Sequence, residues 1–271
     1  MIPPTTDATI VVVPCFNEAA RLDLAAYDAF LECADGIDLL MVDDGSVDDT
    51  PQVLERLRGR HPSRVSVLRL GRNSGKAEAV RRGVQAALGR RPALVGYWDA
   101  DLATPLEAIV QFRAVLAARP ELALVMGSRV PLLGRAIQRR PARRLLGRAF
   151  ATAASLALGL AVYDTQCGAK LFRATPLVTG LFQLPFRARW VFDVELLARL
   201  AAATRGADSP PVEELVYEYP LERWQDVGGS RLTPRDFAVA ALDLAMIGWR
   251  YRKHYVAPSA TAVAPARREA A

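Results

Sequence analysis

The sequence predicts an α/β fold with a mostly parallel central sheet flanked by helices. Short runs of β-branched residues alternate with helical patterns through the first half of the chain, as in strands joined by covering helices. The 271 residues are 51% hydrophobic and 24% charged, which provides enough apolar material for a substantial core and excludes a disordered chain.

Strands and helices are expected in regular alternation up to about residue 126. The strands are short apolar runs, at Thr9–Pro14, Asp38–Val42, Val65–Leu70, Leu94–Trp98 and Leu122–Met126. The helices lie between them, at about Ala19–Cys33, Thr50–Arg60, Lys76–Leu88 and Pro105–Ala118. The pair Thr50-Pro51 is typical of a capping residue followed by proline in the first helical turn.

The second half of the chain indicates two basic amphipathic helices. Residues 129–148 carry seven arginines and no acidic residue, and they lead into the uncharged segment Ala149–Tyr163. Asp236–Arg252 is the second candidate. Such helices either lie on an anionic membrane surface or pack on the sheet or on each other, and the sequence leaves both open. No apolar run reaches the ~18 residues of a spanning helix, and residues 254–271 are expected to form a disordered tail.

Composition excludes several classes of function. Three cysteines without a CxxC pair argue against a disulfide framework and a zinc site, and they fit a reducing cytosol. With two histidines, neither a His ligand cluster nor a Ser–His pair is expected. The formal charge of +6 does not predict nucleic-acid binding, because the basic residues adjoin apolar helices and lack interleaved aromatic residues.

Charged residues follow the predicted strands at their carboxyl ends, where ligands bind in sheets of this kind. Asp99 and Asp101 follow a strand two positions apart, so both carboxylates can face one hard divalent cation completed by substrate phosphates. Alone, such a triplet is more often a turn and a helix cap. It is accompanied by Asp43–Ser46, whose oxygens can accept from a ribose or base, and by Gly71–Lys76, which opens a helix and favours an anion.

The glycine-rich segment Gly71–Lys76 does not match other phosphate-binding motifs. Three residues separate its glycines and Ala77 follows Lys76, whereas a P-loop needs four residues and then Ser or Thr. The chain also has neither GxGxxG nor GxSxG. The sequence therefore favours a phosphorylated ligand without the motifs of a kinase, a dehydrogenase or an esterase.

Eight ordered segments resemble the motifs of family 2 inverting glycosyltransferases. The segments typical of the whole family are Pro14–Glu18, Val42–Ser46, Arg72–Lys76, Asp99–Leu102 and Gly127–Arg129. Those that resemble the branch of dolichyl-phosphate β-glucosyltransferase are Asp164–Lys170, Arg189–Glu195 and Trp224–Arg231. The resemblance spans about Ile10 to Arg252. It implies a GT-A fold in a single domain over residues 1–253, with a nucleotide-sugar-binding half at 8–128 and an acceptor-binding half at 129–253.

The resemblance implies transfer of a hexose from a nucleotide diphosphate sugar to a polyprenyl phosphate, with UDP-glucose favoured and GDP-mannose as the alternative. The residues implied around the nucleotide sugar are Pro14, Phe16, Asn17, Glu18, Asp43, Asp44, Gly45, Ser46, Asn73, Lys76, Asp99, Ala100 and Asp101. Asp99 and Asp101 would hold Mg²⁺ or Mn²⁺, which offsets charge on the leaving nucleotide.

The acceptor side calls for cations more than for a base. A phosphate monoester has a second pKa of about 6, so it is mostly dianionic at neutral pH and already nucleophilic. The residues implied on this side are Arg129, Gln166, Lys170, Arg189, Trp190, Trp224 and Arg231. The implied catalytic residues are Asp101, Arg129, Asp164 and Asp193, the last two as bases or as orienters of cations. Arg189 could instead form a surface ion pair, and the tryptophans could belong to the core.

Two departures from the family pattern concern the acceptor. Ala77 stands where Gly is frequent, and Ala169 where an aromatic residue is frequent. No membrane anchor of the kind common in lipid-linked members is recognised. A soluble acceptor therefore stays an alternative, as does a nucleotide-sugar binding protein without turnover, although Asp99, Asp101 and Arg129 are intact. We expect a cytoplasmic protein. If the two basic helices bind lipid, it is peripheral on the cytoplasmic face of the membrane; with a soluble acceptor, the helices are packing elements.

Overall fold

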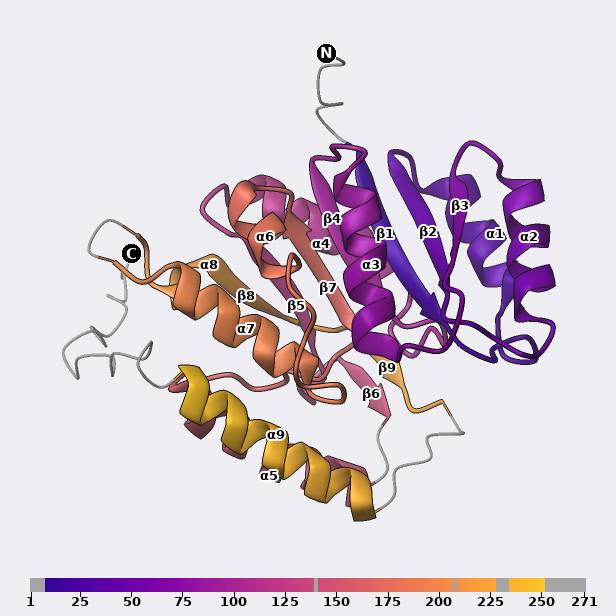
Figure 1. The fold of residues 1–271 in the computed structure, drawn as a ribbon. Coiled ribbons are helices and arrows are strands. Elements are labelled where there is room, and N and C mark those ends of the chain that lie inside the picture. The colour runs from indigo at the N-terminus through magenta and orange to yellow at the C-terminus, as the bar shows by residue number, and fades with distance from the viewer. Residues whose placement is uncertain (1–7, 139–140, 207–208, 228–233, 252–271) are drawn as a thin grey trace.

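The computed structural model describes residues 8–138, 141–206, 209–227 and 234–251, and it confirms the predicted α/β class (Figure 1). The central sheet has the strand order β3-β2-β1-β4-β7-β5-β8. Neighbouring strands run parallel except at β7, which is antiparallel to both β4 and β5. A second sheet pairs β6 with β9.

The strands predicted in the first half all form, with small shifts at their ends. They are β1 (Thr9–Cys15), β2 (Ile37–Asp43), β3 (Val65–Arg69), β4 (Leu94–Trp98) and β5 (Leu124–Ser128). The strands without a sequence prediction are β6 (Ala136–Gln138), β7 (Ala169–Arg173), β8 (Val216–Pro220) and β9 (Arg223–Gln225). All four lie in the second half of the chain, where no regular alternation of strands and helices in the sequence indicates them.

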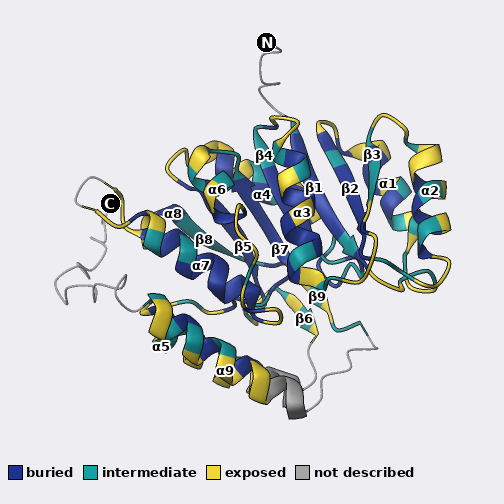
Figure 2. Ribbon diagram, in the orientation of Figure 1, coloured by how far each residue is buried: buried dark blue, intermediate teal, exposed yellow. Residues whose placement is uncertain are grey.

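Helices cover both faces of the sheet, and each face has its own apolar core. One face packs against α1 (Leu24–Cys33), α2 (Thr50–Arg60) and α4 (Glu107–Ala118). The other packs against α3 (Lys76–Leu88), α6 (Pro176–Leu181) and α7 (Phe192–Ala203). The short α8 (Val212–Leu215) leads into β8. The inner strands β1, β2, β4, β5 and β7 are buried along most of their length, whereas the edge strands β3 and β8 are mostly half-buried (Figure 2).

The first helix starts later than predicted. The sequence pattern suggests a start at Ala19, but α1 begins at Leu24, because the Asp23 carboxylate caps it by accepting a hydrogen bond from the Ala26 amide at 3.1 Å. Residues 16–23 instead form a loop at the carboxyl edge of the sheet, next to the ends of β1 and β2. This loop carries three of the residues expected to bind the nucleotide sugar, namely Phe16, Asn17 and Glu18.

The two helices predicted in the second half form α5 (Pro141–Leu158) and α9 (Pro234–Tyr251), and they pack against each other (Figure 1). The close approach is visible at Gly248, where an added Cβ would lie 3.6 Å from the Cβ of Ala157. The segment from Arg129 to Tyr163 is not one continuous helix, because β6 precedes α5 and Gly159 ends it with a left-handed φ of 68°. In the part of the chain that the structure describes, no helix is both long and apolar enough to span a membrane.

The antiparallel strand β7 positions the site. It pairs Ala169 with Trp98 of β4 and Lys170 with Met126 of β5, so the loop before it lies beside the ends of both strands. The Asp99 amide donates to the Gly168 carbonyl at 3.0 Å, which joins this loop to the segment after β4. Residues 164–168 are thereby brought next to residues 99–101, although more than 60 positions separate them in the sequence.

Candidate active site

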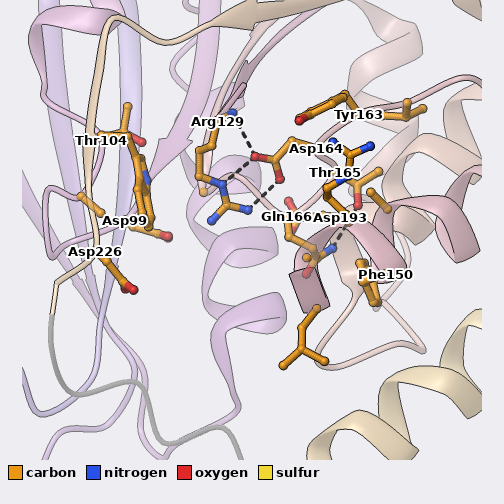
Figure 3. A pocket seen from close by; sticks show the side chains of 18 of the residues that line it. Asp99, Thr104, Arg129, Phe150, Tyr163, Asp164, Thr165, Gln166, Asp193 and Asp226 are labelled. Atoms are coloured by element: carbon orange, nitrogen blue, oxygen red, sulfur yellow. Dashed lines mark hydrogen bonds and ion pairs between the residues drawn. The ribbon is translucent and has the colours of Figure 1, made fainter. Parts of the chain in front are cut away.

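A cavity of about 660 Å³ opens at the carboxyl edge of β4 and β5 (Figure 3). Its polar walls come from the segments after β4 and β5, the loop before β7 and the start of α7. A further wall comes from α5, which contributes mainly small and apolar residues: Leu146, Gly147, Arg148, Phe150, Ala151, Thr152 and Ser155. The cavity thus joins a charged region to an apolar one.

The segments after β1 and β2 form one interlocked cluster beside α3. The Asp44 carboxylate accepts from the Ser74 and Gly75 amides, each at 2.8 Å, and so fixes the start of α3. Burial raises the pKa of Asp44 against the effect of these two hydrogen bonds. Gly45 has a φ of 70°, and an added Cβ would lie 2.5 Å from the Arg72 carbonyl carbon, so the two loops touch only because this residue is glycine.

The remaining residues expected near the nucleotide belong to the same cluster. Asp43 is buried and accepts from the Ser46 amide at 3.0 Å, while the Asn17 amide donates to the Ser46 hydroxyl at 3.0 Å. Asn73 accepts from the Gly75 amide. Pro14 lies in β1, and Phe16, directly after the strand, is exposed. The structure therefore gathers these predicted residues around one edge, with several of their polar atoms used to shape the loops.

Asp99 and Asp101 both line the cavity, together with Lys76 at the start of α3. Lys76 Nζ lies 2.5 Å from Asp99 Oδ1, and Arg21 Nη2 lies 3.7 Å from Asp101 Oδ2. Burial, followed by the charge of Asp99, raises the pKa of Asp101. Ala100 between them is buried. The two negative charges repel each other at the cavity wall, so a bound cation would stabilise this pair of carboxylates.

The donor set suits a hard divalent cation that completes its coordination from a ligand. Within the described ranges, no cluster of three or more His, Cys, Asp or Glu side chains is arranged to hold a metal ion. Two carboxylates plus phosphate oxygens and water are a common set for Mg²⁺ in nucleotide chemistry. Gly168 backs the pair, because any Cβ there would overlap the Asp99 carboxylate. The residues present therefore fit such an ion.

Arg129 follows β5 and is held in a fixed orientation by Asp164 (Figure 3). Arg129 Nε and Nη2 each donate to the Asp164 carboxylate at 2.6 Å, and the Arg129 amide donates to it at 3.0 Å. The guanidinium carbon also lies 5.2 Å from the ring centre of Trp224 in β9. Burial disfavours the charge of Arg129, but Asp164 outweighs this and raises the pKa of Arg129. The result is a permanent cation on the cavity wall, fixed in position.

Lys170, which was expected to contact the acceptor, is buried in the protein interior and does not line the cavity. Its side chain is 0% exposed, and Nζ donates to the Thr165 and Cys167 carbonyls at 3.0 and 2.8 Å and to Asp193 Oδ1 at 2.5 Å. The hydroxyl of Tyr97 donates to the same oxygen. Asp193 itself lines the cavity at the start of α7. The reason is β7, which directs Lys170 into the protein interior on the α7 side of the sheet.

The other predicted acceptor residues have different positions. Gln166, Trp190 and Trp224 line the cavity, and Trp190 is 48% exposed. Arg189 also lines it but reaches toward the loop before α3, where its Nη2 lies 3.5 Å from the Ser74 carbonyl oxygen. Arg231 and the tail 254–271 lie outside the described residues.

Several lining residues were not singled out from the sequence. Thr104, Phe150, Tyr163, Thr165 and Asp226 all face the cavity (Figure 3). Tyr163, Thr165 and Asp226 lie in or beside segments that sequence analysis did identify, so their neighbourhood was the available signal. Phe150 had only the apolar periodicity of its helix, which does not distinguish a cavity wall from a packing face.

Comparisons with known proteins identify the family of this chain. The model of the family "Glycosyl transferase family 2" matches residues 10–178. A dolichyl-phosphate beta-glucosyltransferase from Drosophila melanogaster is 34% identical over 89% of this chain and 74% of its own length. One from Trichomonas vaginalis is 31% identical over 92% of this chain and 73% of its own length. A polyprenol monophosphomannose synthase from Mycolicibacterium smegmatis is 30% identical over 62% of each chain.

Solved structures share the fold at lower identity. A mannosyltransferase from Pyrobaculum calidifontis in complex with GDP-Man and Mn²⁺ aligns with a TM-score of 0.61, 19% identity, and 92% and 65% of the two chains covered. Glucosyl-3-phosphoglycerate synthase from Mycobacterium tuberculosis, in complex with Mn²⁺, UDP and glucosyl-3-phosphoglycerate, aligns with a TM-score of 0.61 and 20% identity. The alignment covers 90% of this chain and 80% of that one. With the family match over residues 10–178, these findings show that the chain belongs to glycosyltransferase family 2 and has the GT-A fold.

Proposed function

We propose that this glycosyltransferase transfers a hexose, with glucose favoured, from UDP-glucose or a similar donor to the phosphate of a polyprenyl phosphate, inverting the anomeric carbon. The observation that carries the proposal is one cavity in which Asp99, Asp101 and Lys76 face Arg129 while α5 provides an apolar wall. A dianionic phosphate on a hydrocarbon chain matches this combination of a fixed cation and apolar surface. The names of relatives that align with most of this chain support the same acceptor class.

On the donor side, the cluster around Asp43 and Asp44 would receive the base and ribose, and the start of α3 would face the diphosphate. The positive end of the helix dipole at the start of α3 and the Lys76 ammonium both favour an anion there. Asp99 and Asp101 would hold Mg²⁺ or Mn²⁺, which when bound offsets the negative charge that develops on the leaving nucleoside diphosphate. The Mn²⁺ in complexes of proteins with this fold supports that assignment.

On the acceptor side, Arg129 would hold the phosphate so that one of its oxygens faces the anomeric carbon. That oxygen forms the new bond to carbon as the bond to the diphosphate oxygen breaks, and the nucleoside diphosphate departs with the electron pair. No proton has to be removed from a dianionic phosphate, so a strong base is unnecessary. Asp164 then orients Arg129, consistent with its bidentate contact, and Asp193 stays paired with Lys170.

The deciding experiment offers purified protein UDP-glucose or GDP-mannose, with Mg²⁺ or Mn²⁺, in the presence or absence of polyprenyl phosphate, and follows products by mass spectrometry. We expect glucosylated polyprenyl phosphate. A mannosylated lipid would instead favour the activity named for the Mycolicibacterium smegmatis relative. Donor binding without any lipid product would refute the acceptor assignment and favour a soluble acceptor.

Replacing Arg129 by alanine should damage acceptor use. We expect kcat/KM for the acceptor to fall roughly 10²–10³-fold, the scale of losing one charge-stabilising group in an active site, with donor KM changing by less than about twofold. Steady-state kinetics with each substrate varied in turn measure this. Arg135→Ala is the matched control, because Arg135 pairs with Glu222 and does not line the cavity. An unchanged acceptor KM and kcat would remove Arg129 from the acceptor site.

We also propose that the exposed face of the α5–α9 pair contacts the membrane that carries the acceptor. Large apolar side chains protrude from both helices: Leu145, Leu146, Leu156, Val239, Leu242 and Trp249. Leu242 is 71% exposed and Trp249 82%, and the cationic Arg250 follows directly. Apolar side chains beside arginines suit the interface of an anionic bilayer. The same pair of helices forms one wall of the cavity through α5, so a lipid phosphate could enter from the bilayer.

Vesicle sedimentation tests this surface. The protein should sediment with phosphatidylglycerol-containing vesicles, and Leu242→Asp should reduce the bound fraction several-fold because it places a charge among the protruding apolar residues. Val110→Asp is the matched control, since Val110 is also exposed but lies on α4 at the opposite face of the sheet. Equal binding of the wild type and Leu242→Asp would refute the assignment of this face.

A further inference from the structure

Glu218 lies in β8 behind the cavity wall and holds the backbone of the loop that carries Asp164. Its Oε1 accepts from the Asp164 amide at 2.8 Å and from the Tyr163 amide at 3.1 Å, and its Oε2 accepts from the Tyr163 amide at 2.9 Å. Glu218 is not among the residues that line the cavity. Burial raises the pKa of this carboxyl, against the two hydrogen bonds that favour the charged form. The partly buried Glu218 carboxylate therefore fixes the positions of the two amides that donate to it.

Lys170 also holds this loop through hydrogen bonds to its backbone. Across the sheet, Met126 pairs with Lys170 of β7 and with Glu218 of β8, so all three side chains are in one row and share a face. Lys170 donates to the Thr165 and Cys167 carbonyls, whereas Glu218 accepts from the Tyr163 and Asp164 amides. An ammonium from β7 and a carboxylate from β8, the two strands that flank β5, thus bind the carbonyls and the amides of one short segment.

The segment 163–167, held by Glu218 and Lys170, in turn fixes the position of Arg129. Asp164 receives the Arg129 amide, Nε and Nη2, so any shift of the Asp164 backbone moves the guanidinium. The Arg129 and Asp164 side chains are only 14% and 8% exposed, which leaves little freedom for compensating movements. Since catalytic groups must be held within a fraction of an ångström, the support behind them influences rate.

We propose that Glu218 is a positioning residue of the acceptor site: through the backbone of Tyr163 and Asp164 it sets the place of Arg129. This inference rests on the proposed function for its kinetic consequence, but its structural part is independent of the substrate. Loss of the Glu218 charge should loosen residues 163–168 and the start of the segment after β5, and it should leave the nucleotide side intact.

The test compares the Glu218→Gln variant with wild type by hydrogen–deuterium exchange and by kinetics. Glutamine keeps the size of the side chain but removes its charge and replaces one oxygen by an NH₂ group, which cannot accept from an amide. One neutral oxygen is then left to accept from both amides, at positions where Oε1 now lies 2.8 and 3.1 Å from them. We expect faster exchange in peptides covering 127–131 and 161–168 and unchanged exchange in those covering 43–46 and 72–76. We also expect acceptor kcat/KM to fall about tenfold with donor KM within about twofold. Glu222→Gln, at an exposed ion pair with Arg135 just after β8, should match wild type in both measurements.

A second variant separates positioning from general stability. In an Asp164→Asn background the link to Arg129 is already weakened, so adding Glu218→Gln should cost less than twofold further in acceptor kcat/KM. Unchanged exchange at 127–131 in Glu218→Gln would overturn the proposal, and so would an equal loss for donor and acceptor. If wild type makes no glycosylated polyprenyl phosphate, the proposed function fails, while exchange at 127–131 still decides the role of Glu218.

Discussion

An Asp101→Asn variant is expected to lose nearly all transfer activity while remaining folded. The change removes one of the two carboxylates that face the cavity beside Lys76, and we expect kcat to fall by roughly 10³-fold or more, equivalent to several kcal/mol of lost transition-state stabilisation. Folding should survive because asparagine keeps the side-chain oxygen that accepts from the Ala103 amide at 3.1 Å and no longer opposes the charge of Asp99. Kinetics and thermal unfolding measure the two effects.

Two further measurements make this prediction specific. The affinity for Mn²⁺ in the presence of UDP, measured by calorimetry, should be at least tenfold weaker in Asp101→Asn. Asp28→Asn is the matched control, since Asp28 pairs with Arg60 and His61 away from the cavity and should retain full activity and Mn²⁺ affinity. Retained turnover in Asp101→Asn would withdraw the assignment of Asp101 as a metal ligand.

A Lys170→Met variant is expected to lose about 3–5 kcal/mol of unfolding free energy, the scale of breaking a buried ion pair by removing one partner. Methionine fills similar space but leaves Asp193 buried without the ammonium at 2.5 Å, and it frees the Thr165 and Cys167 carbonyls. Denaturant-induced unfolding gives the difference. Activity should fall as well, because the loop that carries Asp164 loses one of its two supports.

A change of the partner Asp193 and a change of Lys76, the lysine that lines the cavity, serve as controls. Adding Asp193→Asn to Lys170→Met removes the uncompensated charge, so it should restore part of the lost stability. Lys76→Met removes the other lysine near the cavity, whose side chain is 44% exposed, and should cost less than about 1 kcal/mol. A loss below about 1 kcal/mol in Lys170→Met would contradict the structural role assigned to that ammonium.

Much of residues 8–128, the part expected to bind the donor, was predictable from sequence because its signals are local. Period and turn residues indicate β1 to β5, and Asp99 and Asp101 are recognised as a pair from their spacing after one strand. Lys76 opens α3 as expected, and the carboxyl ends of parallel strands must meet at one edge. These inferences needed only the order of residues along short stretches.

The arrangement of residues 129–253, the part expected to bind the acceptor, depended on contacts that spacing does not encode. Arg129 was recognised from its place after a strand, but Lys170 was expected at the acceptor and is instead fully buried. Arg189 was expected on the acceptor side and reaches toward Ser74. Glu218 carried no sequence signal at all, since one glutamate in a short strand resembles any surface position.

The sequence by itself therefore determined the α/β class, the carboxylate pair, the cation at Arg129 and the family resemblance. Only the tertiary structure decided which charged side chains face the cavity and which support its walls. The physical reason is the insertion of β7, antiparallel, between β4 and β5, with β8 on the other side of β5. That order sets Lys170 and Glu218 in one row beneath residues 163–168, a pairing between distant segments that is fixed by sheet register and burial.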